Sequence, residues 1–287
     1  MRKPLLDCYL ELAKPRILMS VLVTTSFGYI LGANGKFEWG KFLFLLLGVA
    51  FVCGGASILN HYLERDIDSK MKRTRNRPLP TGRIAANNAL LLGVICVLIG
   101  VFVLYYKIDL LTSFLSLLST FLYVLVYTPL KRISWLNTSL GAIPGALPPM
   151  GGWVAATGEL SVGAWVLFFI LFIWQHPHFF AIAWMFREDY RLGGFKMLPV
   201  IEPDGKRTFF QVMLFSILLI PCSLLPVFFN MTGKIYFWGT LSAGILLLMT
   251  SLYFVRTKTD GSAKQLLKAT VFYLPVLLLL IIFDSSF

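Results

Sequence analysis

One short stretch of this sequence carries polar residues whose spacing could do chemistry. Asn60, Glu64 and Asp68 stand four residues apart at the end of a long apolar segment. At about 100° per residue, an α-helix places all three within about 80° of arc, on a single face. Two carboxylates and an amide suit a hard cation, and proteins bind Mg²⁺ through a few carboxylates together with phosphate oxygens of a substrate. We therefore predict that Asn60, Glu64 and Asp68 hold Mg²⁺.

The residues after this face are strongly basic. They include Arg73, Arg75, Arg77 and Arg83. Guanidinium groups match phosphate oxygens in both charge and geometry. An acidic face beside a basic loop is the arrangement expected for a diphosphate bridged by a metal ion. The alternative is that the acids reach toward the membrane surface and that the cations only orient the chain in the membrane.

A second polar region has a similar character but fewer acids. Asp189, Arg191 and Lys196 surround a Gly-Gly pair, and a separate loop contributes Lys131 and Arg132. These residues could add charge to the same site. For Lys131 and Arg132 the alternative is a positive anchor at the membrane surface.

Two of the three histidines lie within an apolar segment. They are His176 and His178, on either side of Pro177. Ionisable side chains at membrane depth are costly and are taken as functional by default. We predict that at least one of them contacts a bound substrate, and the alternative is a packing role. If the helix runs on past Pro177, His178 shares a face with Asp189, whereas a kink at Pro177 would be needed to bring both histidines together.

The elements that position these residues are membrane helices. The chain of 287 residues is 57% hydrophobic and 14% charged, with a mean hydropathy of +0.75. Apolar stretches of about 18 to 22 residues recur, each long enough to cross the hydrocarbon layer as a helix. We predict an all-α polytopic membrane protein with a single domain, 1–287. Its nine spans are 16–33, 41–60, 87–106, 110–128, 136–156, 162–186, 208–229, 235–254 and 268–284.

The distribution of cations predicts the topology. Of 26 Lys and Arg, only Lys36, Lys41, Lys107 and Lys234 fall in the odd-numbered loops, where Lys268 is counted with the preceding even-numbered loop. The positive-inside rule then places the amino terminus and the even-numbered loops in the cytoplasm. The net charge of +12 is explained by this asymmetry, and nucleic acid is not an expected partner. The first residues lack the features of a signal or transit peptide, which favours a bacterial inner membrane.

The predicted span 136–156 is unusual because it is rich in glycine and proline, with Pro144 and Pro148 near its centre. Small residues permit close helix approach, and prolines free backbone carbonyls. A kinked packing helix and a helix that lines a substrate cavity are both compatible with this composition.

Taken together, these motifs resemble those of the UbiA-type intramembrane prenyltransferases. The run from Asn60 to Asp68 matches the first signature of that family, NxxxDxxxD, with Glu64 at the middle position. The segments 73–82, which contains Arg-Pro-Leu-Pro, and 127–132, Tyr-Thr-Pro-Leu-Lys-Arg, also match. The likeness covers the whole chain. It departs from the family at the second signature, where Met185 stands four residues before Asp189 and leaves one acid instead of several.

Within the family, the chain looks most like the members that farnesylate heme b. The middle Glu64, the His-Pro-His-Phe-Phe-Ala segment and the run 189–199 carry this closer resemblance. It implies a bundle of nine helices around a central cavity that opens to the cytoplasm, Mg²⁺ as the cofactor, and farnesyl diphosphate and heme b as substrates. It implies Asn60, Glu64, Asp68 and Asp189 as catalytic residues, with His176 and His178 as heme contacts. The diphosphate-binding residues would be Arg73, Arg77, Lys131, Arg191 and Lys196.

Two alternatives remain at this stage. A related prenyltransferase acting on an aromatic or quinone precursor would use the histidines only for packing. A secondary transporter would also carry polar residues within the membrane, but near its midplane, whereas here they gather at one surface. A downstream heme-modifying enzyme or a terminal oxidase is an expected partner for a heme substrate, although no residue pattern points to one.

Overall fold

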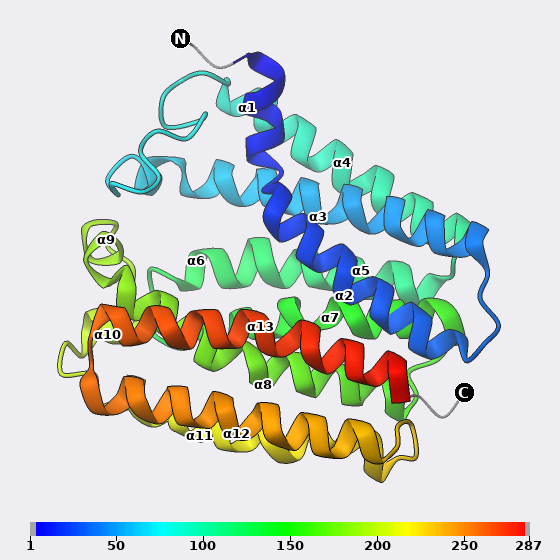
Figure 1. Ribbon diagram of the computed structural model, residues 1–287. Coiled ribbons are helices and arrows are strands. Elements are labelled where there is room, and N and C mark those ends of the chain that lie inside the picture. Colours follow the sequence, from blue (N-terminus) through cyan, green and yellow to red (C-terminus); the bar gives the residue numbers. More distant parts are fainter. Residues whose placement is uncertain (1–3, 285–287) are drawn as a thin grey trace.

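The computed structural model describes residues 4–284, whose regular elements are all helices. The long helices lie side by side, and each runs from one end of the bundle to the other (Figure 1). In chain order the helices are α1 (Leu5–Leu12), α2 (Pro15–Ala33), α3 (Trp39–Asp68), α4 (Ala86–Lys107), α5 (Leu110–Phe121), the π-helix η1 (Leu122–Tyr127), α6 (Thr128–Leu130), α7 (Asn137–Thr157), α8 (Val162–Met185), α9 (Arg187–Leu192), α10 (Leu198–Ile201), α11 (Lys206–Phe228), α12 (Lys234–Thr257) and α13 (Asp260–Asp284).

Eight helical segments within residues 4–284 are long and apolar enough to cross a membrane. They are α2, α3, α4, the continuous segment Leu110–Leu130, α8, α11, α12 and α13. This finding confirms an all-α polytopic membrane protein. The fifth predicted span, 136–156, coincides with α7, but α7 is not among the eight because its glycines and prolines lower its hydropathy. A ninth crossing therefore stays a prediction.

Two helices extend further than predicted, both at the same end of the bundle. α3 continues to Asp68 instead of ending at residue 60, and α13 begins at Asp260 instead of residue 268. Lys268, which is counted with the preceding loop for the topology, is thus well inside a helix. The predicted boundaries follow the end of each apolar run, whereas a helix at a membrane surface can continue through charged residues. The short helices α1, α9 and α10 are not predicted by hydropathy.

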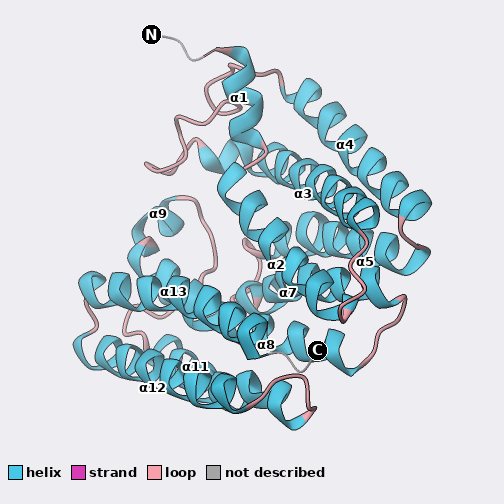
Figure 2. Ribbon diagram, turned by 45° about the vertical axis from the view of Figure 1, so that its right-hand side comes forward, coloured by secondary structure: helices cyan, strands magenta, loops and turns pink. Residues whose placement is uncertain are grey.

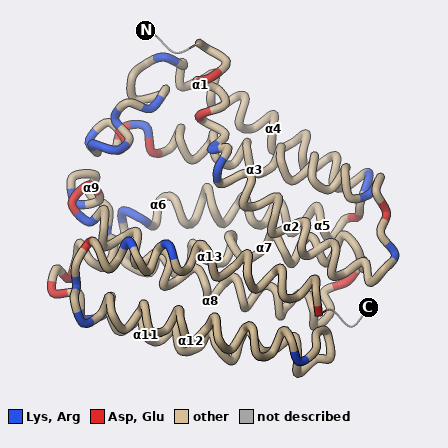
Figure 3. The backbone as a smooth tube through the Cα atoms, viewed as in Figure 1, with Lys and Arg blue, Asp and Glu red and all other residues tan. Residues whose placement is uncertain are grey.

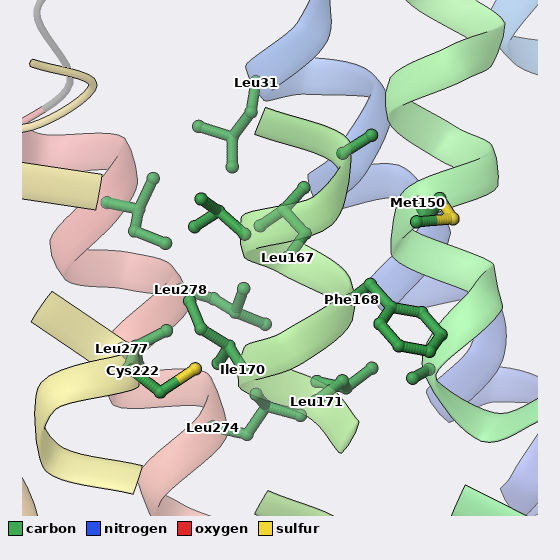
Figure 4. Close-up of a cluster of buried hydrophobic side chains, with 14 of the residues drawn as sticks. Leu31, Met150, Leu167, Phe168, Ile170, Leu171, Cys222, Leu274, Leu277 and Leu278 are labelled. Carbon is green, nitrogen blue, oxygen red and sulfur yellow. The ribbon is translucent and has the colours of Figure 1, made fainter. Parts of the chain in front are cut away.

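Large apolar side chains cover the outside of the bundle. Leu98, Phe102, Phe272 and Phe283 are examples, each more than half exposed. Apolar exposure on this scale is expected of a surface that faces lipid. Inside, α8 is the most buried of the eight candidate spans. Its Leu167, Ile170 and Leu171 pack with apolar residues of α13 and α11 (Figure 4).

Glycines allow two pairs of helices to approach closely. In the α3–α4 pair, a Cβ atom on Gly55 would lie 2.7 Å from the carbonyl oxygen of Gly93, and Gly48 and Gly100 repeat this arrangement seven residues away. In the α2–α7 pair, a Cβ atom on Gly152 would collide with the carbonyl oxygen of Thr25. Small residues at such positions let helix backbones meet, as membrane helix packing favours. The two pairs can be followed in Figure 2.

We expect Gly55→Ala to lower the thermal unfolding midpoint of the detergent-solubilised protein. The added methyl group has no space against α4, and overpacking of this kind costs about 1–3 kcal/mol. Gly151→Ala is the matched control, because it is also a buried helical glycine but has no atom within 4 Å of the place that the added methyl group would occupy. Equal midpoints for the two variants would contradict the close α3–α4 packing.

Candidate active site

The acidic face lies in the last two and a half turns of α3 and is buried. Asn60, Glu64 and Asp68 are 1%, 5% and 0% exposed. The helix ends immediately afterwards at Ser69, whose backbone N–H donates to the carbonyl oxygen of Arg65. The predicted single face is therefore present in the structure. Two carboxylates held away from water require compensating charge.

Each member of this face has its own basic partner. The Lys131 ammonium donates to Glu64 Oε1 at 2.8 Å, and the Arg77 guanidinium donates to both oxygens of Asp68 at 2.9 and 2.7 Å. The ammonium of Lys14 donates to Asn60 Oδ1 at 2.6 Å. The three cations come from three separate segments of the chain: the α1–α2 turn, the loop after α3, and the end of α6. We call these six residues the charge cluster.

Lys14 is not among the predicted site residues. It connects α1 to α2 in the left-handed region, with φ 50° and ψ 66°, which is uncommon for a residue with a side chain. This turn lets the amine reach both Asn60 and the hydroxyl of Tyr123, at 3.2 Å. The signal in the sequence is a lysine directly before Pro15 at the start of an apolar run, but it gives no indication of proximity to Asn60.

The π-helix η1 shapes the opposite wall of the site. Its wider turn carries Tyr123 and Tyr127, whose rings stack at a centroid distance of 5.8 Å. The Lys131 ammonium lies 4.5 Å from the centre of the Tyr127 ring. Thr128 links this segment to α3, because its hydroxyl donates to the Tyr123 carbonyl and accepts from the Asn60 amide. Single π-turns inside α-helices often occur at functional sites, and this one is missed from sequence because hydrophobic periodicity does not distinguish the two helix types.

The environment shifts the pKa of two of these cations in opposite directions. For Lys131, burial alone would lower the pKa, but the Glu64 carboxylate outweighs it and holds the pKa above its usual range. For Lys14, loss of hydration and the nearby charge of Lys131 lower the pKa from 10.5 to about 7. Lys131 and Arg77 thus remain cations, whereas the charge of Lys14 depends on pH near neutrality.

His61 lies beside the charge cluster without joining it through a hydrogen bond. The side chain is buried, and neither ring nitrogen has a hydrogen-bond partner among the described residues. Its Nδ1 is 3.8 Å from Asp68 Oδ2. His61 therefore lies on the same face of α3 as Asp68.

The loop after α8 meets the loop after α3 over this end of the bundle. Asp189 accepts a hydrogen bond from the backbone N–H of Lys72 at 3.3 Å. The Arg73 guanidinium lies over the rings of Phe186 and Tyr190, at 5.1 and 5.9 Å from their centroids. An apolar cluster joins the end of α3 and the loop after it to the segment after α9, and its buried members are Ile67, Met71, Phe195 and Met197. The structure thus places Asp189 against the loop after α3, and it places Arg73 against the segment that follows α8.

Two predicted diphosphate residues, Arg191 and Lys196, have exposed side chains. Arg191 is exposed and pairs with Glu188, and its hydrogen bond lowers the pKa of the Glu188 carboxyl. Lys196 is exposed as well, and its backbone N–H donates to the carbonyl oxygen of Lys131. Within residues 4–284, no hydrogen bond or ion pair links either side chain to the acidic face of α3. Figure 3 shows the cations of both loops gathered at the end of the molecule that holds α9.

The two histidines of α8 face different neighbours. α8 continues through Pro177 to Met185, so the helix passes both residues without interruption. His176 is fully buried and stacks on Phe215 of α11, whereas His178 is half-buried and bonds to Thr270 of α13. α8 ends at Met185, and Asp189 lies in the separate short helix α9, which begins at Arg187. The continuous helix face that would have joined His178 to Asp189 is therefore absent.

The donor set of the acidic face fits the predicted metal. Its three side chains offer oxygen atoms, which Mg²⁺ prefers, and the adjacent cations are suited to phosphate oxygens that would complete the coordination. No group of three or more His, Cys, Asp or Glu side chains in the described range forms a metal site by protein ligands alone. A metal held jointly by this face and a substrate diphosphate agrees with both observations.

Comparisons with known proteins place this geometry in context. The sequence profile of the UbiA prenyltransferase family matches residues 21–276. The protoheme IX farnesyltransferase of Salinibacter ruber is 44% identical over 276 residues, 96% of this chain and 98% of that protein. The protoheme IX farnesyltransferase of Solibacter usitatus is 40% identical over 285 residues, with coverage of 96% and 98%.

Solved structures share the fold at low sequence identity. A structure of digeranylgeranylglyceryl phosphate synthase in membranes superposes with a TM-score of 0.83 at 19% identity, covering 98% of each chain. A UbiA homolog from Archaeoglobus fulgidus bound to DMAPP and Mg²⁺ gives a TM-score of 0.68 at 17% identity, covering 95% of this chain and 98% of that one.

We expect Lys131→Met to destabilise the protein by about 3–5 kcal/mol, because it leaves the Glu64 carboxylate buried without its partner. The double variant Glu64→Gln/Lys131→Met should recover most of that loss. Denaturant unfolding in detergent measures both. The control is Arg191→Met, which breaks an exposed pair and should leave the midpoint unchanged. Additive effects of the two cluster substitutions would show that the buried pair is not coupled.

Lys14 should make stability depend on pH. Between about pH 7 and 10.5 the unfolded chain keeps the Lys14 proton that the folded protein has released, so stability should rise with pH in this window. The unfolding midpoint, measured from pH 6 to 9, should therefore rise more in the unsubstituted protein than in Lys14→Met. The exposed Lys70 provides a control, and Lys70→Met should keep the full pH dependence. Identical pH profiles for all three proteins would refute the role of Lys14.

Proposed function

The chain belongs to the UbiA prenyltransferase family, and from this premise we propose that it acts as a protoheme IX farnesyltransferase. It transfers the farnesyl group of farnesyl diphosphate to a vinyl group of heme b and yields heme O and diphosphate. The structural observation that carries the diphosphate chemistry is the charge cluster, in which three oxygen-bearing side chains face three cations. The choice of heme as acceptor is supported by the names of relatives that match this chain over nearly its full length.

Asn60, Glu64 and Asp68 would hold Mg²⁺. When bound, it supplies Lewis-acid stabilisation of the leaving diphosphate. The A. fulgidus homolog, which contains both a prenyl diphosphate and Mg²⁺, supports this choice of cofactor. Glu64 in place of the more common aspartate keeps the same carboxylate chemistry with one more methylene group.

The cations of the cluster bind the diphosphate. Lys131 and Arg77, which neutralise Glu64 and Asp68 in the structure, neutralise the phosphate oxygens as negative charge develops on them. Lys14 is placed to contribute a third contact. Asp189, Arg73, Arg191 and Lys196 stay predictions, with Asp189 and Arg73 acting from the two joined loops.

The reaction balances with water as the third reactant. The carbon–oxygen bond at C1 of the farnesyl group breaks, and the electron pair leaves with the diphosphate. The terminal vinyl carbon of heme forms the new bond to C1, and the neighbouring carbon gains positive charge. A water molecule adds to that carbon and releases a proton, which completes the hydroxyethylfarnesyl substituent. The apolar spans enclose the farnesyl chain and keep other water away from the allylic cation.

The orientation in the membrane follows from the cations. The amino terminus and the joined loops lie in the cytoplasm of a bacterial cell, which the cation asymmetry supports. α7 provides a ninth crossing, and the whole chain forms one domain around a cavity that opens to the cytoplasmic side. Its length of 21 residues and its extensive burial support this assignment of α7.

Glu64→Gln should lower the rate of farnesyl transfer at least about a hundredfold, because it removes a carboxylate that holds Mg²⁺. The purified protein is incubated with heme b, farnesyl diphosphate and Mg²⁺, and the mass gain on the porphyrin is measured. Heme binding, followed by absorbance, should survive the substitution.

Asp66→Asn is the matched control, because Asp66 belongs to the same helix but is exposed on another face. It should retain the activity of the unsubstituted protein. Full activity in Glu64→Gln would remove the proposed role of this carboxylate. If the unsubstituted protein adds no mass to heme but prenylates an aromatic precursor, the acceptor has been assigned wrongly.

A further inference from the structure

The two histidines of α8 differ in whether a ring nitrogen is free. His176 has none to offer. Its Nδ1 lies 2.8 Å from the carbonyl oxygen of Phe172 and its Nε2 lies 3.2 Å from the hydroxyl of Ser139. The ring also stacks on Phe215 with a centroid distance of 3.6 Å. A ligand could reach His176 only by breaking these contacts in a fully buried place.

His178 makes one hydrogen bond, and its geometry reveals which nitrogen carries the proton. Nδ1 is 2.9 Å from the hydroxyl oxygen of Thr270. That hydroxyl donates its hydrogen to the carbonyl oxygen of Leu267 at 2.7 Å. A threonine hydroxyl has a single hydrogen, so in the bond with His178 it can only accept. Nδ1 of His178 therefore bears the hydrogen, and in the neutral ring Nε2 holds a lone pair.

The Nε2 atom has no hydrogen-bond partner among the described residues, and the side chain is half-buried. The ring is nevertheless held in place. Trp174, one turn earlier on α8, stacks on it with a centroid distance of 4.8 Å and an interplanar angle of 22°. The Trp174 indole N–H in turn donates to the backbone carbonyl oxygen of Thr270 at 2.9 Å. One residue of α13 thus orients the imidazole through its hydroxyl and the supporting indole through its backbone.

We propose that Thr270 is a positioning residue that holds His178 as the Nδ1–H tautomer, so that Nε2 of His178, and not of His176, binds the iron of the heme substrate. Imidazole binds metals as the neutral ring, and the hydrogen bond at the other nitrogen sets the tautomer, the orientation and the basicity of the ligand. An axial histidine is a common way to hold heme iron. This inference rests on the proposed function, because heme must be the acceptor.

The test compares Thr270→Val with Thr270→Ser in the full chain, titrated with ferric heme b and followed by absorption and electron paramagnetic resonance spectra. Valine keeps the shape but removes the acceptor for Nδ1–H, while the backbone carbonyl that bonds Trp174 remains. Loss of such a partner typically costs about 10–100-fold in metal affinity, so heme binding should weaken about tenfold or more and the iron signature should change. Thr270→Ser keeps a hydroxyl and should restore both.

Two further variants identify the ligand. His178→Ala should abolish the imidazole signature of the bound heme, and added imidazole should bring it back. Ser139→Ala removes the partner of His176 Nε2 and should leave the heme spectrum unchanged. A purely structural role for Thr270 would lower the unfolding midpoint without altering the iron signature of the heme that still binds.

The results separate this inference from the proposed function. If the unsubstituted protein farnesylates heme while Thr270→Val and His178→Ala keep its affinity and spectrum, the inference is overturned and the function stands. A spectrum altered by Ser139→Ala but not by Thr270→Val would assign the iron to His176 and also overturn it. If the unsubstituted protein neither binds nor farnesylates heme, the proposed function fails and this inference fails with it.

Discussion

The burial of two carboxylates at the end of α3 is the constraint on which the rest of the structure depends. Glu64 and Asp68 cannot remain charged in a membrane protein's interior without compensation, and breaking such a buried pair is strongly destabilising. Lys131 and Arg77 provide that compensation, and Lys14 donates a hydrogen bond to the neutral amide of Asn60 beside them. Three otherwise separate segments therefore converge on one helix end. The same cations are suited to receive a diphosphate, so the requirement for stability and the requirement for catalysis select the same residues.

Close packing of the helices makes this convergence possible. The α3–α4 and α2–α7 pairs meet at glycines, and the α1–α2 turn also meets α3 at a glycine, because a Cβ atom on Gly54 would lie 3.9 Å from the Cβ atom of Ala13. The π-helix η1 then adjusts the fourth crossing locally so that Tyr123, Tyr127 and Lys131 face the cluster. A regular α-helix would distribute these residues differently. The irregular backbone lies where the chemistry is expected, while the lipid-facing helices around it stay regular.

The second half of the bundle is organised around α8. Two histidines of this helix have different surroundings. His176 and His178 are two positions apart on a helix and so point in different directions. His176 is enclosed by Ser139, Phe172 and Phe215, and His178 contacts Trp174 and Thr270.

The loops from the two halves of the bundle meet through Asp189 and Arg73. The fold is shared with solved structures at 17–19% identity, which indicates that such a bundle tolerates extensive substitution.

The sequence by itself determined the membrane class, the helix positions and the acidic face of α3, because all of these depend on local hydropathy and on a helical repeat that is the same everywhere. It also indicated the family, through motifs that are contiguous in the chain. Only the tertiary structure decided which cation meets which acid, that Lys14 belongs to the cluster, that Arg191 pairs with Glu188, and which histidine keeps a free nitrogen. These are pairings between residues such as Lys131 and Glu64 or His178 and Thr270, which lie 67 and 92 positions apart. They arise from helix packing and turn conformation, which no local pattern encodes.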